Sequence, residues 1–127
     1  MSDEAGKTDL KKRLRAYALR IIRMYTALPK NDKVAQVIGG QVLRSGTSVG
    51  AQHAEGTRAR SDAEFISKLE SALQELEETD YWLYLIVESN LLLEEKLSSL
   101  IEETHELNAI FTSSIKTVKK RINSKHR

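Results

Sequence analysis

Cysteine is absent from the 127-residue sequence, and proline occurs once, at Pro29. Without cysteine the chain can form no disulfide framework, no cysteine-ligated zinc site and no cysteine nucleophile. With a single proline, little interrupts helix formation along most of the chain. Hydrophobic residues make up 40% of the sequence and charged residues 30%. Together with the length, this composition predicts one globular domain, residues 1–127, with a core of its own.

Long hydrophobic runs are also scarce. No apolar segment follows Met1, so we expect no secretory signal. The most apolar run, Tyr81–Val87, is too short to span a bilayer. These absences predict a cytoplasmic protein that does not enter a membrane.

Motifs of catalytic and metal sites are incomplete. The run GQVLRSGTS from Gly40 loosely resembles a phosphate-binding loop, but it lacks the lysine after the second glycine and a preceding strand. His53 and Glu55 match half of a zinc-deaminase signature whose other half requires cysteine. Glu102 and His105 form half of a di-iron motif, with no second copy, and a solvated pair is the better interpretation. We therefore predict no catalytic residue, no metal site, no cofactor and no enzymatic activity.

The formal net charge of +2 conceals a strong segregation of charge. Residues 1–60 hold twelve Lys or Arg against five Asp or Glu, and residues 107–127 hold six against none. Residues 61–106 hold two against thirteen. Basic ends and an acidic middle are compatible with two interpretations. They could steer nucleic acid to one face, or they could pair the helices with each other.

Apolar residues recur at helical spacing in four segments, which predict helices at about 9–28, 32–58, 62–90 and 93–121. We expect the termini, 1–7 and 122–127, to be frayed. Pro29-Lys30-Asn31 marks the first break, with Asp32 as a helix cap, and Ser61 or Asp62 caps the third helix. Short turns between four helices predict an all-α, antiparallel, up-down-up-down four-helix bundle. The first and last helices have heptad-like stripes: Leu10, Leu14, Tyr17, Ile21, Met24 and Leu28, then Leu97, Leu100, Ile101, Thr104, Leu107, Phe111, Ile115, Val118 and Ile122.

The second segment contains five of the six glycines. Each glycine inside a helix costs about 1 kcal/mol relative to alanine, so repeated glycine favours close approach to a neighbouring helix. One long, bent helix is a better interpretation than two short helices separated at Gly39-Gly40. Its predicted core stripe is Val34, Ile38, Val42, Ser45, Val49 and Gln52.

The third segment ends in the run Tyr81–Val87, which is apolar or aromatic on every side of the helix. A helix of this kind must be covered on every side, and one small bundle covers about half of it. We therefore predict a contact with another subunit through Tyr81, Trp82, Tyr84 and Leu85. The alternative is a core helix whose amphipathic tyrosines lie at its margin.

The basic ends provide candidate phosphate contacts. A solvated helix face, and charges that complement a helix dipole, are the alternatives. Few aromatic residues accompany these cations, so we expect recognition of backbone and shape without base stacking. Arg58 and Arg60, beside the start of the third helix, could hold a phosphate or be solvated. Arg44 could contact phosphate or pair with a carboxylate across the bundle. The predicted nucleic-acid-binding residues are Lys11, Lys12, Arg13, Arg15, Arg20, Arg23, Lys116, Lys119, Lys120 and Arg121.

The run QVLRSGTSVGAQHAEG, residues 41–56, is followed by Phe65, Leu69, Ala72, Glu75 and Glu78 at fixed spacing. This order resembles the four-helix-bundle family named for proteins encoded in intervening sequences of 23S rRNA genes. In that family a Q-L-x-R-A-x-x-S-I-x-x-N-I-A-E-G-like run precedes an F-x-x-x-L-x-x-A-x-x-S/E-x-x-E-like helix. The resemblance extends from about Leu10 to Lys120. The chain departs from it at Gln52, where the pattern has Asn, and at His53, where it often has Ile.

The resemblance implies a cytosolic, non-enzymatic protein that forms a ring-shaped homo-oligomer of five subunits. The family is also similar to the accessory variability determinant protein of diversity-generating retroelements, a basic pentamer that binds reverse transcriptase and nucleic acid. The combined prediction is an oligomeric protein that contacts the phosphates of RNA or of an RNA–DNA hybrid. The alternative is an accessory adaptor that binds a reverse transcriptase in such a retroelement.

Overall fold

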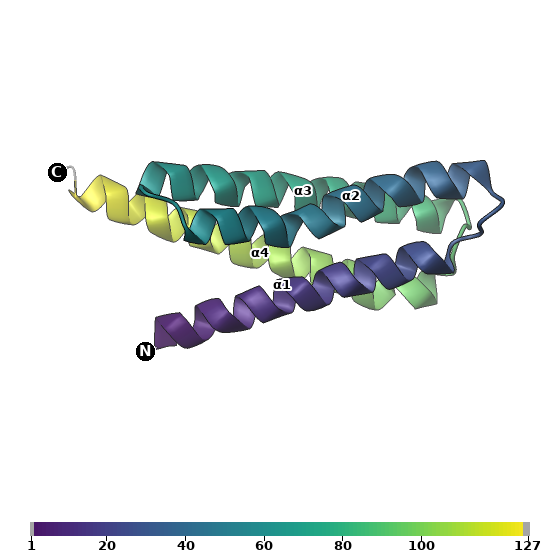
Figure 1. The fold of residues 1–127 in the computed structure, drawn as a ribbon, viewed down its shortest axis with the longest axis horizontal. Coiled ribbons are helices and arrows are strands. Elements are labelled where there is room, and N and C mark those ends of the chain that lie inside the picture. Colours follow the sequence, from purple (N-terminus) through teal and green to yellow (C-terminus); the bar gives the residue numbers. More distant parts are fainter. Residues whose placement is uncertain (1, 126–127) are drawn as a thin grey trace.

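The computed structural model describes the backbone of residues 2–125 and the side chains of residues 9–125. Four helices, α1 (Ser2–Ala27), α2 (Lys33–Thr57), α3 (Asp62–Glu88) and α4 (Glu94–Lys125), follow one another through short turns. Consecutive helices run in opposite directions, so the chain is an all-α, up-down-up-down four-helix bundle (Figure 1), as predicted. None of the helices in the described part has the length and apolar character needed to cross a membrane.

The helix boundaries follow the predicted turn chemistry at two of the three turns. The Asp32 side chain accepts a hydrogen bond from the backbone N–H of Ala35 at 3.0 Å, and Ser61 accepts one from Glu64 at 3.1 Å. The outer ends differ from the prediction, because α1 begins at Ser2 and α4 continues to Lys125. Extending an existing helix gains one hydrogen bond for each residue that is ordered, so a formed helix readily continues into polar sequence. Residues 1, 126 and 127 lie outside the described part.

The core lies along the predicted stripes of α1, α3 and α4, whose central members are buried. Two hydroxyl pairs are buried within it. Tyr17 of α1 and Thr104 of α4 are 2.7 Å apart, and Ser45 of α2 and Thr79 of α3 are also 2.7 Å apart. A buried hydroxyl needs a partner, so each pair fixes how two helices are aligned along their length.

The buried face of α2 agrees with the predicted one at Val42, Ser45 and Val49 and differs from it elsewhere. Val34, predicted to lie in the core, is 55% exposed. The buried residues are mostly small: Ala35, Gly39, Val42, Ser45, Gly46, Val49, His53 and Gly56. A side chain at Gly46 would place its Cβ 2.8 Å from Cγ1 of Ile21 in α1, and one at Gly39 would meet Leu28. The prediction of one continuous helix in close contact with a neighbour is therefore confirmed. Its core face consists mostly of small residues, which a search for large apolar side chains does not identify.

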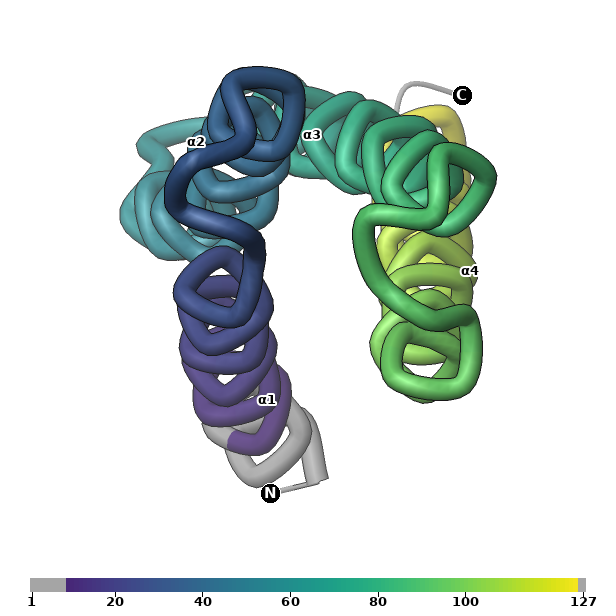
Figure 2. The backbone as a smooth tube through the Cα atoms, turned by 90° about the vertical axis from the view of Figure 1, so that its right-hand side faces the viewer, coloured from purple at the N-terminus to yellow at the C-terminus, as the bar shows by residue number. Residues whose placement is uncertain are grey.

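The four helices are arranged along an arc in the order α1, α2, α3, α4, so that α1 and α4 face each other across its open side (Figure 2). Helix α1 packs on α2, and α4 packs on α3. The contacts between α1 and α4 include three polar links: Arg13 with Glu103 and Glu106, Tyr17 with Thr104, and Arg20 with Ser99. We call this boundary the α1–α4 seam.

Candidate nucleic-acid interface

Basic side chains from distant parts of the sequence gather at one end of the bundle. The first half of α1, the α2–α3 turn and the second half of α4 all lie at the end where the two chain termini are found (Figure 1). We call this the basic end, defined by Lys11, Lys12, Arg15, Arg58, Arg60, Lys116, Lys120 and Lys125. Arg20 and Arg23, also predicted as phosphate contacts, lie on the last part of α1 near the opposite end. There they border a smaller cleft of about 300 Å³ with Lys96.

Some of the predicted phosphate contacts are occupied by carboxylates. Arg13 donates to Glu103 at 2.6 and 2.7 Å and to Glu106 at 2.7 Å. The hydrogen bonds from Arg13 lower the pKa of Glu103, which therefore stays ionised. Lys119 lies 3.5 Å from Glu70, and Arg121 lies 2.9 Å from Asp62. These three cations join helices to one another.

The remaining predicted contacts form no ion pair with any described residue. Arg20 donates a hydrogen bond to Ser99 at 3.0 Å, and the others are exposed on the surface. Such cations are free to bind an external anion. They are Lys11, Lys12, Arg15, Arg23, Lys116 and Lys120.

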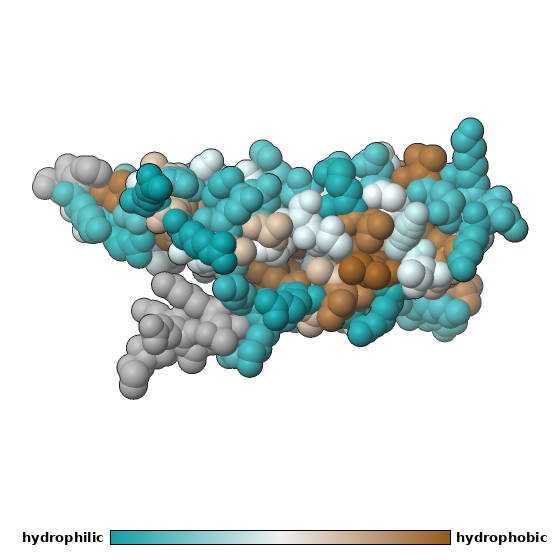
Figure 3. Space-filling model, in the orientation of Figure 1, coloured by the Kyte–Doolittle hydropathy of each residue, from teal (hydrophilic) through white to brown (hydrophobic). Residues whose placement is uncertain are grey.

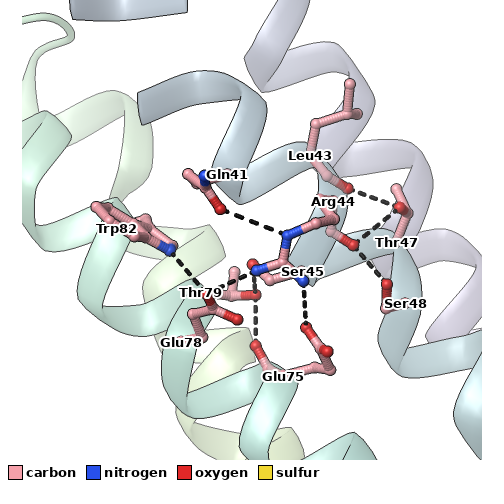
Figure 4. Close-up of polar contacts among 10 residues, drawn as sticks. All are labelled: Gln41, Leu43, Arg44, Ser45, Thr47, Ser48, Glu75, Glu78, Thr79 and Trp82. Carbon is pink, nitrogen blue, oxygen red and sulfur yellow. Dashed lines mark hydrogen bonds and ion pairs between the residues drawn. The ribbon is translucent and has the colours of Figure 1, made fainter. Parts of the chain in front are cut away.

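Arg44 takes the carboxylate alternative. Its guanidinium lies 2.6 Å from Glu78 and 3.3 Å from Glu75, both on α3 (Figure 4). Trp82 also donates to Glu78, at 3.4 Å, and the hydrogen bond from Arg44 lowers the pKa of Glu78. The acidic middle of the sequence therefore serves helix pairing, while part of the basic sequence at the two ends forms no ion pair within residues 9–125.

A groove of about 1090 Å³ opens at the basic end of the α1–α4 seam. We call it the seam groove. The second half of α4 and the first half of α1 form its sides, and the end of α2 with the start of α3 closes its base. Its lining includes buried His53 and Phe111, partly buried Phe65, and the exposed arginines Arg60 and Arg121. The sequence offered only the incomplete motif at His53 as a signal, because the lining comes from all four helices and the α2–α3 turn.

The predicted oligomer contacts are divided between core and surface. Tyr81 and Tyr84 are 59% and 60% exposed, whereas Trp82 and Leu85 are partly buried. Packing within one chain therefore leaves the two tyrosines uncovered. Five more large apolar side chains are exposed, and sequence reasoning missed them: Leu19, Ile22, Val34, Val37 and Leu93. All seven lie in the half of the bundle opposite the basic end, and apolar residues gather in the middle and right of the view in Figure 3.

The acidic and histidine side chains do not converge on a common point. Within the described residues, no group of three or more such side chains could hold a metal ion. Glu102 is exposed, and His105 lies 2.9 Å from Asp80 on the neighbouring helix. Of this half-motif, His105 is therefore engaged in a surface contact between helices and Glu102 is exposed on the surface.

Residues 7–113 match the family model of the 23S rRNA-intervening sequence protein. The chain belongs to this family. The chain is similar to a crystal structure from Bacteroides thetaiotaomicron, with 39% identity and a TM-score of 0.78. That structure is of a protein with unknown function from the S23 ribosomal protein family. That similarity covers 84% of this chain and 97% of the other. None of the curated proteins matches this chain.

Membership of the 23S rRNA-intervening sequence family confirms the resemblance found in residues 41–56 and in the helix that follows. The family match includes the basic residues of α1 and of the α2–α3 turn. It ends at residue 113, before Lys116 and Lys120. The cations of the last part of α4 are therefore features of this chain that the match does not cover.

Proposed function

We propose that this 23S rRNA-intervening sequence protein is a non-enzymatic, oligomeric protein that binds the phosphates of RNA, or of RNA paired with DNA, through its basic end. The observation that carries the proposal is the convergence of cations that form no ion pair with the described side chains. Lys11, Lys12 and Arg15 of α1 lie at the same end of the bundle as Lys116 and Lys120 of α4. Each phosphate contact releases a condensed counterion, so binding of this kind depends steeply on salt.

Assembly of several subunits would strengthen this binding. A few phosphate contacts on one small subunit give weak binding at physiological salt. Repeating the basic end around an oligomer multiplies the contacts without any new type of interaction.

The exposed apolar side chains support a ring. Leu19 and Ile22 lie on α1, whereas Tyr81 and Tyr84 lie on α3, and these two helices are not neighbours in the bundle. A ring needs two different surfaces on each subunit, one for each neighbour, and an apolar patch on each of two sides meets that requirement. We propose a closed ring, with the five subunits that the family resemblance implies.

The test of RNA binding is fluorescence anisotropy of a labelled structured RNA across a salt series. The double variant Lys116→Glu/Lys120→Glu is expected to weaken binding about ten-fold or more and to reduce the salt slope by about 2. The matched control is Lys30→Glu/Lys33→Glu, which makes the same charge change with exposed residues at the opposite end. Negligible binding at low salt, or equal losses in both double variants, would contradict the proposal.

Oligomerisation is tested separately by sedimentation velocity. Replacing Tyr81 and Tyr84 by Glu places charge in the proposed contact and should convert the ring to smaller species. Charge changes at the basic end should leave the subunit number unchanged. If the wild-type chain is a monomer, its exposed apolar side chains favour the second candidate function, an adaptor that docks on a protein such as a reverse transcriptase.

A further inference from the structure

Helix α1 has an exposed apolar patch with a basic border. Leu19 and Ile22 are 46% and 42% exposed. Arg15 lies about one helical turn before Leu19 and Arg23 about one turn after it, and neither arginine forms an ion pair with another described residue. Residues one turn apart share a helix face, so the two arginines flank the apolar pair. Residues 10–27 include no Asp or Glu, and we call this surface the α1 face.

Helix α3 has an exposed apolar patch with an acidic border. Tyr81 and Tyr84 are 59% and 60% exposed. Glu77 lies about one turn before Tyr81 and Glu88 about one turn after Tyr84. Both carboxylates are exposed, and neither forms an ion pair with another described residue. Residues 69–88 include no Lys or Arg, and we call this surface the α3 face.

The cation nearest to the α3 face is engaged elsewhere. Arg44 of α2 lies 3.3 Å from Glu75 and 2.6 Å from Glu78, on the side of α3 that packs against α2. Glu77 is two residues from Glu75 and two residues from Thr79, which also contacts α2. Residues two apart lie on nearly opposite sides of a helix, so Glu77 is directed away from Arg44.

The two faces overlap in height along the bundle. Gly46 of α2 faces Ile21 of α1, and the residue before it, Ser45, is 2.7 Å from Thr79 of α3. Helices α1 and α3 run in the same direction (Figure 1). The part of α1 around Ile21 is therefore level with the part of α3 around Thr79.

From this arrangement we infer that the α1 face of one subunit binds the α3 face of a second copy, and that this one contact, repeated, closes the ring. The inference rests on the oligomer of the proposed function and names the surfaces that meet. Rotation about an axis along the bundle leaves heights unchanged, so Arg23 of one copy and Glu77 of the next lie within about one helical turn of each other in height. The two apolar pairs then bury each other's exposed surface.

Other occupants match these faces less well. Two α1 faces would bring Arg15 and Arg23 of both copies together, and two α3 faces would do the same with carboxylates. Like charges oppose such contacts, whereas opposite charges favour binding and fix the register. A contact between unlike faces also repeats into a ring, whereas contacts between like faces produce two-fold pairs. Nucleic acid or an anionic membrane would fit the border of the α1 face but would be repelled by the α3 face.

Two blocked chains test the contact. Leu19→Glu/Ile22→Glu adds charges that repel the border of the α3 face, and Tyr81→Lys/Tyr84→Lys adds charges that repel the border of the α1 face. All four residues are exposed, so both variants should fold as the wild type does, which circular dichroism checks. In sedimentation velocity we expect the wild type to be a larger oligomer and each blocked chain to be a monomer. An equimolar mixture should form a dimer with one copy of each, because one chain keeps its α3 face and the other its α1 face.

The mixed dimer contains a single contact, so its charge pairing can be measured by isothermal calorimetry. Arg23→Glu in the chain with the blocked α3 face should raise the dissociation constant about ten-fold, and so should Glu77→Arg in the other chain. Both changes together restore a pair of opposite charges, so the dissociation constant should return to within about three-fold of the original. The matched control is Glu102→Arg, at an exposed carboxylate of α4, which should leave the dissociation constant unchanged.

The outcomes separate this inference from the proposed function. A monomeric wild type overturns the ring and the inference together. A wild-type oligomer whose blocked chains still associate with themselves overturns the inference alone, and dimers of each blocked chain would identify contacts between like faces. A mixture that stays monomeric, or a charge swap that weakens binding as much as the two single changes combined, also overturns it. Failure of RNA binding in the anisotropy test removes the phosphate-binding part of the proposed function, while a mixed dimer still supports the contact.

Discussion

Helix α1 meets its two neighbours in different ways. Against α2 it packs at close range. Gly39 and Gly46 of α2 have no side chains, so Leu28 and Ile21 can approach the α2 backbone. Against α4 it is held by polar links, of which the Tyr17–Thr104 pair is buried and those of Arg13 and Arg20 lie nearer the surface, and a groove opens at each end of the seam. The backbone of α1 therefore approaches α2 more closely than it approaches α4.

This difference explains how a small bundle can have both a stable core and a site. Close apolar packing contributes most of the stability of a helix in a protein, whereas exposed ion pairs contribute about 0–1 kcal/mol each. The α1–α2 boundary can hold the helix in place without help from α4. The α1–α4 seam is then available for a groove that brings together residues from all four helices.

The largest expected effect comes from filling the close boundary. Gly46→Leu should lower the free energy of unfolding by about 3 kcal/mol, because its Cβ alone would lie 2.8 Å from buried Ile21. Gly40→Leu is the matched control, since nothing lies within 4 Å of a Cβ at Gly40. It should raise stability by about 1 kcal/mol through helix propensity. Urea unfolding followed by circular dichroism measures both, and equal effects would refute the account of close packing.

A smaller effect is expected at the buried polar link of the seam. Tyr17→Phe removes the hydroxyl that lies 2.7 Å from Thr104, and should cost about 1 kcal/mol. Thr104 keeps its other hydrogen bond, to the carbonyl of Leu100 at 2.9 Å. In the double variant Tyr17→Phe/Thr104→Val both partners become apolar, so its loss should be less than the sum of the two single losses. Strictly additive losses in chemical unfolding would show that the pair does not act as a unit.

The smallest effect is expected at the partly exposed ion pair of the seam. Arg13 lowers the pKa of Glu103 in the folded state, so the pair stabilises the fold above the unfolded pKa of about 4.3 and loses this contribution as pH falls through the lower folded value. Arg13→Gln should therefore cost less than about 1 kcal/mol at pH 7 and less still at pH 3. Urea unfolding at the two pH values checks the sign. A larger loss at pH 3 than at pH 7 would contradict the assignment.

The sequence predicted those parts of the fold that depend on large side chains and on local turn chemistry. Leu14, Tyr17 and Ile21 repeat at helical spacing, and Asp32 and Ser61 cap helices within a few residues of their partners. The core face of α2 could not be found in the same way. Val42 and Val49 of its buried face were predicted, but the buried face also contains Gly39, Gly46 and Gly56, whose burial reflects the close approach of neighbouring helices rather than their own hydrophobicity.

The candidate site was predictable only as a set of charges. The sequence identified the cations of α1 and α4, but it contained no signal that Arg13, Lys119 and Arg121 pair with carboxylates while Lys12 and Lys120 pair with none of the described ones. Pairing depends on which helices lie side by side, and on the angle at which each side chain leaves its helix. The seam groove depends on the same tertiary arrangement. The position of His53 in its lining can therefore be recognised only from the placement of α1 and α4.

The glycines that let α2 approach α1 also determine when α2 can exist as a helix. Five glycines within Lys33–Thr57 lower its intrinsic helix stability by about 1 kcal/mol each. An isolated helix in water is only marginally stable, so this loss is enough to prevent the segment from forming a helix on its own. The segment is therefore a coil until α1 and α3 are present to pack against it. Its helical hydrogen bonds therefore form together with the rest of the bundle. Any motion that separates α1 from α2 also removes the packing that keeps α2 helical.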